Sequence, residues 1–544
     1  MENLLLPAVV VSITFIMAAF PYLHNIKIKK KHYALTVISV FAISIRIIWV
    51  ELVQVVPESD FYTYHTLAQN ILKGNIKNSV FVSLFPHVFG FSKFLSFFYA
   101  VFKPVPDTAV YLNIALNLGI LLMIYFLGKN LVSVNTGLTA AAIYAFWPSQ
   151  IFFNVFVLTE PLYTFGVLFI ICLYYAFLTR INNTVFIVLS LFTLGALTGL
   201  LRLIRPTAVL LLLSILIHYF FIAGKTPSLN FSPLKQLKQP PVFPGLHLSK
   251  SRNLKAFSDA VNSPVMKAAD ISVPLYHQPG KVSVWSGAPA HDMKINKNLL
   301  NKLKAGAVKT GYRFLLSAVL VLSCNALTGV LIGSIEKNIG IETARHTSGF
   351  YLLVGTNPEG KGKYNDKDAA VLNALINKGI PADEIQRKLS ESGVERILKT
   401  DIMSQLRLQM FKNKCMWRLD SDCISFTRAH ISKTSHINIE KHYMWLSGVA
   451  DFYYSVFFFI ALSSVFFLRK NIPSFCFVFY LYILGTVAAH MLAEVQSRYH
   501  YPVIPVFCIL AAAVLTRKPA RGGLPAVNTN TGGNGISTKA RSGF

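Results

Sequence analysis

Long apolar stretches, separated by short polar connections, dominate the chain. A membrane-spanning helix takes roughly 17 to 25 predominantly apolar residues, and several stretches reach or approach that length. The pattern predicts eleven spanning helices, at residues 4–23, 33–56, 110–127, 131–147, 162–178, 185–201, 207–222, 314–332, 444–468, 475–493 and 503–515. Hydrophobic residues fill 53% of the 544 positions and charged residues only 14%, more apolar surface than a soluble core would hide. We therefore expect an all-α, polytopic, multi-pass protein of the cell membrane.

Basic residues near the ends of the predicted spans indicate how the chain is oriented. Lys and Arg in short connections are retained on the cytoplasmic side of a membrane. When successive connections are assigned alternately to the two sides of the membrane, one set of basic residues near the span ends falls on the same, cytoplasmic side. These residues are Lys27, Lys29, Lys30, Lys31, Lys129, Arg180, Arg469, Lys470, Arg517 and Lys518. Five connections should then face the extracytoplasmic side together, at 57–107, 148–159, 201–206, 333–443 and 494–502.

The spans group into an N-terminal transmembrane module at 1–222, a single span at 314–332 and a C-terminal group at 444–515. Between the first two, residues 223–313 hold fourteen Lys or Arg against three Asp, without a helical or strand period. This composition predicts a disordered cytoplasmic insertion that touches anionic membrane lipids. A nucleic-acid partner is not expected, because no aromatic platform accompanies the charge. The tail at 516–544 has a disordered composition too.

The segment at 333–443 is different in kind, since it holds seventeen basic and thirteen acidic residues. Helical periodicity at 366–378, 381–392 and 394–414 predicts a small extracytoplasmic helical domain. It could regulate the protein, bind an acceptor as a cap, or act as a spacer. Cys415 and Cys423 lie within it, and an exported pair this close is a candidate disulfide.

The first outer connection, 57–107, contains the acidic sequence that suggests chemistry. Apolar residues from Phe61 to Leu72 fall at helical spacing and Gly74 follows, which predicts an amphipathic surface helix with Asp60 as its N-cap. This carboxylate could both cap the helix and act in catalysis, because a group fixed at a helix start is already oriented for an incoming hydroxyl. A second surface or re-entrant helix, broken at Pro86 and His87, should cover the same site.

Charged residues at the ends of other spans complete the candidate set. Glu160 opens a span, where it also complements the helix dipole. Arg202 and Arg205 fall on the expected outer side, against the positive-inside tendency, which suggests that they bind an anion such as a lipid phosphate. The alternative is that the number of predicted spans before them is wrong, in which case they are ordinary cytoplasmic anchors. Glu494 and Arg498 are four residues apart and could form a plain helix-surface pair.

The order of these motifs resembles bacterial GT-C glycosyltransferases, particularly the mannosyltransferase-like and aminoarabinose-transferase-like group. The motifs are Pro57-x-Ser59-Asp60 running into Tyr64, Ala68, Ile71 and Gly74; Trp147-Pro148-Ser149 leading to Leu158-Thr159-Glu160; Arg205-Pro206; Glu494-x-x-x-Arg498-Tyr499 with Pro502; and the run from Tyr351 to Gly360. The likeness covers most spans and the outer segment, but not 223–313. It implies a GT-C-like fold and inverting transfer of one sugar, outside the membrane, from a polyprenyl-phosphate donor to a lipid or glycan acceptor.

The resemblance also implies roles for individual residues. Asp60 would be the general base that deprotonates the acceptor hydroxyl, and Glu160 an accessory acid. Arg205 and Arg498 would stabilise the leaving polyprenyl phosphate. The remaining substrate-binding candidates are Glu58, Tyr64, His65, Arg202, Glu494 and Tyr499. Glu58 and Asp60 are separated by one Ser, so binding of a divalent metal by this acidic pair stays an open alternative. No ligand spacing in the sequence predicts a metal site, however.

Two functions from other classes remain as alternatives. A secondary transporter would also have many spans and buried charges, but it should show two similar halves with broken helices in matching places, and the sequence shows none. A non-catalytic, lipid-binding membrane scaffold would explain the outer segment and would tolerate loss of Asp60.

Overall fold

The computed structural model describes residues 28–181, 183–223, 297–468 and 473–517. The predicted span at 4–23, most of the insertion and most of the tail lie outside these residues. The chain divides into two compact units, one of Met1–Lys225 with Arg313–Phe544 and one of Thr226–Tyr312. Of the second unit, the structure describes the helical stretch from Lys297 onward.

All regular elements in the described part of the chain are helical, as expected for an all-α protein. Among the described residues, eight helices are long and apolar enough to cross a membrane, which supports a multi-pass membrane protein. They are α2 (Ile28–Leu52), α6 (Pro106–Leu131), α9 (Glu160–Arg180), α10 (Thr184–Arg202), α14 (Lys297–Ile339), α20 (Ile439–Phe467), α21 (Phe477–Leu492, preceded by η3, Ser474–Cys476) and α22 (Ile504–Leu515, preceded by η4, Ser497–Val503).

Two further predicted spans are shorter than a bilayer crossing requires. Helix α7 (Val134–Ala145) has 12 residues, which at 1.5 Å per residue is about 18 Å against a hydrocarbon core of about 30 Å. Helix α11 (Ala208–Ile217) has 10 residues before a π-helical turn, η2 (His218–Ile222). The predicted count of eleven is therefore not confirmed. Helix α7 is enclosed by protein, and Arg46 of α2 donates a hydrogen bond to the carbonyl of Ala145 at its end (2.9 Å).

The first outer connection folds into short helices, as predicted. These are α3 (Ser59–Lys73), α4 (Val80–Leu84) and α5 (Pro86–Val101). Pro86 begins α5, where a missing backbone N–H is no loss. Helix α3 ends at Gly74, whose φ of +75° favours glycine. One prediction is wrong: the N-cap of α3 is Glu58, while Asp60 lies inside the first turn and its carboxylate is free to bond elsewhere.

The segment at 333–443 contains α15 (Gly349–Gly355), α16 (Asp366–Asn377), α17 (Ala382–Lys399), α18 (Ile402–Trp417) and α19 (Asp422–Ala429). The three predicted helical stretches correspond to α16, α17 and α18, although α17 continues to Lys399, past the predicted break at residue 393. All five helices belong to the same compact unit as the spanning helices. The predicted disulfide is wrong, because Cys415 and Cys423 are both free; the Cys423 thiol donates to the Asp420 carbonyl instead (3.0 Å).

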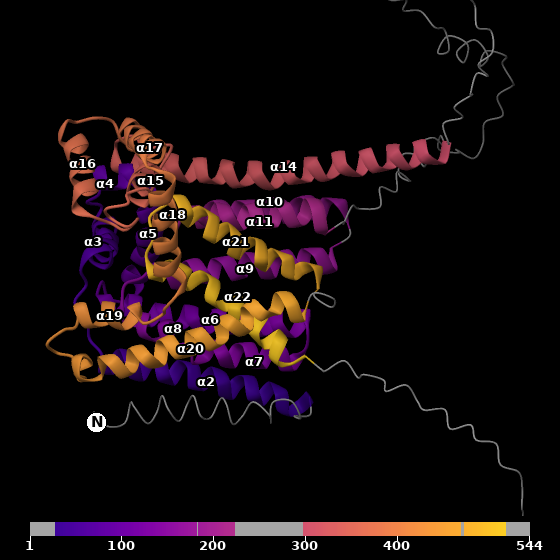
Figure 1. Cartoon of the computed structure of the whole chain (residues 1–544), viewed down its shortest axis with the longest axis horizontal. Coiled ribbons are helices and arrows are strands. Elements are labelled where there is room, and N and C mark those ends of the chain that lie inside the picture. The colour runs from indigo at the N-terminus through magenta and orange to yellow at the C-terminus, as the bar shows by residue number, and fades with distance from the viewer. Residues whose placement is uncertain (1–27, 182, 224–296, 469–472, 518–544) are drawn as a thin grey trace, which may run out of the picture. The chain divides into compact units, whose positions relative to one another are not determined.

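Helices α3 to α5 and α15 to α19 gather at one end of the bundle, on the left in Figure 1. Helices α8 (Pro148–Phe152) and η1 (Phe153–Val155) lie there as well. Backbone and side-chain hydrogen bonds join separate connections: Val56 N–H donates to His430 O (2.8 Å), and the Trp147 indole to Asp420 Oδ2 (2.9 Å). The Glu494 N–H donates to Tyr351 O (2.9 Å). The five connections that the sequence placed on one side thus meet in space.

Candidate functional site

Arg498 joins the connection at 494–502 to the first outer connection, 57–107. It lies in η4, and its Nη2 donates to Asp60 Oδ2 in α3 at 2.5 Å. The guanidinium lies over the rings of Phe61 and Phe426, 5.4 and 5.8 Å from their centroids. The Arg498 side chain is only 6% exposed, whereas the Asp60 side chain is 50% exposed. The pair therefore consists of an anchored cation and a carboxylate that a substrate can reach.

Glu160 forms the buried side of the same network. It is the first residue of α9 and its side chain is 1% exposed. Its Oε1 accepts from Arg205 Nη2 and lies 3.7 Å from Arg498 Nε, while its Oε2 accepts from the Thr159 hydroxyl (3.1 Å). Arg205 Nε donates to the same hydroxyl (3.1 Å). One carboxylate at a helix N-terminus, where the dipole favours negative charge, thus holds two guanidiniums.

Glu494 reaches Arg498 through a third side chain. Gln496 Nε2 donates to Glu494 Oε1 and Arg498 Nε donates to Gln496 Oε1, both at 2.8 Å. Residues 493–496 are not helical, so the simple helix-surface pair considered for Glu494 and Arg498 is wrong. Burial raises the pKa of Glu494; the Gln496 hydrogen bond opposes this shift and the nearby Asp60 charge adds to it.

Two tyrosines border the two arginines. Tyr499, a predicted binding residue, lies under Arg205, whose guanidinium carbon is 5.3 Å from the ring centroid. Tyr64 packs edge-on against Phe91. The charges of Asp60, Arg205 and Arg498 are close enough to affect the pKa of its hydroxyl. Burial, with Asp60 as the next cause, raises the pKa of Tyr64. Its hydroxyl therefore remains a hydrogen-bond donor near the network at neutral pH.

Sequence reasoning missed Tyr351 and gave His87 no place in the site. Tyr351, in α15, has its hydroxyl 3.0 Å from His87 Nε2, in α5. Burial, with the nearby Arg205 charge as the next cause, lowers the pKa of His87 to about 4, so this imidazole is neutral at physiological pH. The available signal was the polar break at Pro86 and His87 in an apolar stretch. Tyr351 opens the run to Gly360 that belongs to the family likeness, but nothing in that run assigns it a role in the site.

Three predicted binding residues lie outside the network. Glu58 is exposed and sits 3.9 Å from His430 Nε2. His65 Nδ1 is 2.6 Å from the Tyr99 hydroxyl. Arg202 donates to Asn325 Oδ1 on α14 (2.9 Å). The prediction that Arg202 shares an anion site with Arg205 is not supported by this placement, because a separate partner holds it.

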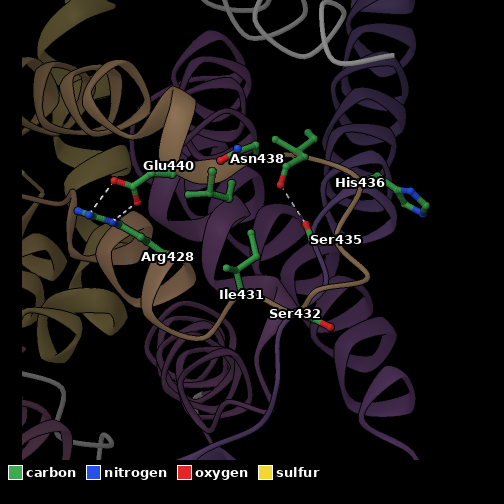
Figure 2. Close-up of a pocket in the computed structure, with 9 residues that line it drawn as sticks. Arg428, Ile431, Ser432, Ser435, His436, Asn438 and Glu440 are labelled. Atoms are coloured by element: carbon green, nitrogen blue, oxygen red, sulfur yellow. Dashed lines mark hydrogen bonds and ion pairs between the residues drawn. The ribbon is translucent and has the colours of Figure 1, made fainter.

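An open pocket of about 320 Å³ lies on the connection between α19 and α20. Figure 2 shows Arg428 paired with Glu440 on one side of it and Ser435, whose hydroxyl donates to Ile437 O (3.2 Å), on the other. None of its lining residues belongs to the network around Arg498. Among the described residues no group of three or more His, Cys, Asp or Glu side chains converges on a point that could hold a metal ion.

The network can bind an anion and move a proton. Two guanidiniums, Arg205 and Arg498, share the buried Glu160 carboxylate, and Arg498 also holds the half-exposed carboxylate of Asp60. Such an arrangement suits a phosphate next to a hydroxyl that must lose its proton. The chain matches no protein-family model, no curated protein and no solved structure.

Proposed function

We propose that the protein is an integral membrane glycosyltransferase of the GT-C type. It transfers one sugar from a polyprenyl-phosphate donor to a lipid or glycan acceptor of the cell envelope, on the extracytoplasmic face, with inversion at the anomeric carbon. The observation that carries the proposal is the contact between Asp60 and Arg498, backed by Glu160 and Arg205. Residues separated by more than four hundred positions come together where several membrane helices end.

In the proposed reaction an acceptor hydroxyl oxygen attacks the anomeric carbon while the bond from that carbon to the phosphate oxygen breaks. The electron pair of the broken bond stays on the departing polyprenyl phosphate. Asp60 accepts the hydroxyl proton; the half-exposed carboxylate supports this role because a substrate can reach it. A protonated Asp60 holds Arg498 less strongly, so the guanidinium is available to the new phosphate charge at the moment that charge develops.

Arg205 and Glu160 have different parts in this proposal. The Arg205 side chain is 16% exposed and can present a guanidinium edge to the phosphate. Glu160 is enclosed by Arg205, Arg498 and Thr159, so it serves as a positioning residue for both cations. This differs from the accessory acid that the family likeness implies, because a carboxylate without solvent access offers no surface to a substrate.

The first test measures binding of polyprenyl phosphate, the reaction product, by the purified full chain in nanodiscs. Arg205→Ala should weaken binding by at least tenfold, and Arg202→Ala, a neighbouring arginine with a separate partner, should not. Equal effects of the two variants would contradict the phosphate role of Arg205. Tight binding without any transfer activity would instead favour a lipid-binding scaffold.

The second test compares cells by mass spectrometry of envelope glycans and lipids. We expect one sugar modification to disappear without the protein, and to stay absent with Asp60→Asn at normal abundance. Asp107→Asn is the matched control, because Asp107 is an exposed carboxylate in the first turn of α6, in the same outer connection. Retention of the modification by Asp60→Asn would rule out this carboxylate as the base.

A further inference from the structure

Helix α18 exposes an apolar stripe that packing leaves uncovered. Ile402 and Met410 are 76% and 74% exposed, and Met403 and Leu406 between them are exposed as well. Their spacing places them on one face of the helix. The opposite face is filled by Leu408, Lys412 and Met416, all buried. At the end of α17, Val394 and Leu398 extend the exposed stripe.

A band of cations borders this stripe. Arg407 and Lys414 are exposed on α18 at helical spacing from Phe411. The ammonium groups of Lys361 and Lys363 lie 5.3 and 5.9 Å from the Phe411 ring centroid. Within the part of the chain that the structure describes, none of these four cations forms an ion pair with a carboxylate. The band therefore offers uncompensated positive charge to an anionic partner.

Helix α18 lies next to the end of a spanning helix. Gln409 Nε2 and Lys412 Nζ of α18 both donate to the Met491 carbonyl in the last turn of α21, each at 2.9 Å. Met491 and Leu492, the last residues of α21, are themselves exposed apolar side chains. Figure 1 shows α18 running across this end of the bundle. Helix α18 is thus fixed, through Gln409 and the buried Lys412, at the end of a spanning helix, and the stripe lies on the side of α18 that this contact leaves free.

We propose that α18 is an interfacial helix that rests on the bilayer. Its stripe enters the boundary between headgroups and acyl chains, and the four cations of the band bind anionic lipid headgroups. An apolar face flanked by basic residues is the pattern of helices that lie in this boundary. Each cation near an anionic membrane surface strengthens binding to that surface about five-fold. A bilayer explains both features at once, and the proposal does not depend on sugar transfer.

The first test places a spin label in the bilayer or in water. The full chain, with Cys172 and Cys415 changed to Ser, carries a nitroxide at Met410→Cys or at Lys367→Cys, an exposed control on α16. It is reconstituted in nanodiscs of phosphatidylcholine and phosphatidylglycerol. The ratio of collisions with oxygen to collisions with a water-soluble nickel complex should be several-fold higher at position 410 than at 367.

Three results would overturn the proposal. Equal ratios at the two positions would place the stripe in water. Dipolar broadening at position 410 would show that a second copy covers it, and protection from both collision partners would show that protein covers it.

The second test addresses the cations. Arg407→Gln with Lys414→Gln should lower the amount of phosphatidylglycerol that copurifies with the protein, measured by native mass spectrometry, by at least five-fold. The control is Arg345→Gln with Lys378→Gln, two exposed cations away from the stripe, which should leave it unchanged. Equal retention by both double variants would refute the role of the band.

Discussion

Replacing Glu160 by Gln removes a buried negative charge while keeping the shape of the side chain. Arg205 then loses its carboxylate and keeps the Thr159 hydroxyl and the Tyr499 ring. Arg498 keeps its contact with Asp60. The substitution therefore leaves one guanidinium nearly buried without a compensating charge.

The expected loss of stability follows from this geometry. Removing one partner of a buried ion pair costs about 3 to 5 kcal/mol. The retained pair of Arg498 and the partial exposure of Arg205 place Glu160→Gln near the lower limit, about 3 kcal/mol. Asp60→Asn should cost about 1 kcal/mol or less, because the half-exposed carboxylate is screened by solvent.

Thermal unfolding of the purified protein in detergent, followed by tryptophan fluorescence, compares these variants with Asp107→Asn. The apparent melting temperature should fall much further for Glu160→Gln than for Asp60→Asn, and hardly at all for the control. Adding Arg205→Gln to Glu160→Gln should restore part of the loss, because the uncompensated charge disappears. Similar losses for Glu160→Gln and Asp60→Asn, or no recovery in the double variant, would refute this view of the network.

Three further predictions concern other parts of the chain. In a transfer assay, Arg205→Ala should raise the donor concentration at half-maximal rate and Arg202→Ala should not; an unchanged donor dependence for the first would argue against phosphate binding. Burial lowers the pKa of Lys412 to about 8, below its unfolded value of about 10.4, so the unfolded chain binds more protons between these values and stability should rise with pH there. Lys412→Met should abolish that rise in the melting temperature, and a persistent rise would exclude Lys412 as its source. A Cβ at Gly195 would lie 2.2 Å from Leu320 O, whereas one at Gly329 would meet nothing within 4 Å; Gly195→Ala should therefore destabilise by about 1 to 3 kcal/mol and Gly329→Ala should not, as thermal unfolding would show.

Hydrophobic patterning predicted the helices well where lipid or a continuous apolar face determines them. The spans that became α2, α6, α9, α10 and α20 are read directly from apolar length, and α3 from its periodicity and Gly74. Patterning misjudged α7, because a helix enclosed by protein is as apolar as one facing lipid. Sequence alone also placed the cap of α3 two residues late, because Asp is a favoured N-cap residue, whereas Glu58 holds this position without a side-chain capping hydrogen bond.

The candidate site was predicted in its charges but not in its contacts. Asp60, Glu160, Arg205 and Arg498 were all recognisable as rare charges at helix ends, where an unpaired charge near hydrocarbon is expensive. Their pairing could not be predicted, because Asp60 and Arg498 meet only through packing of helices far apart in the chain. Tyr351 carries no charge, and the motif that it opens assigned it no role, so its distance from His87 is what places it at the site.

Sugar transfer by the purified protein tests the central claim most directly. The full chain and its Asp60→Asn variant would be reconstituted in liposomes with polyprenyl-phosphate sugars and envelope acceptors extracted from the cells that make the protein. We predict release of polyprenyl phosphate and a sugar-bearing acceptor from the unaltered protein, and neither from the variant. Equal turnover by both proteins, or none by the unaltered protein while it binds polyprenyl phosphate, would contradict the proposed function.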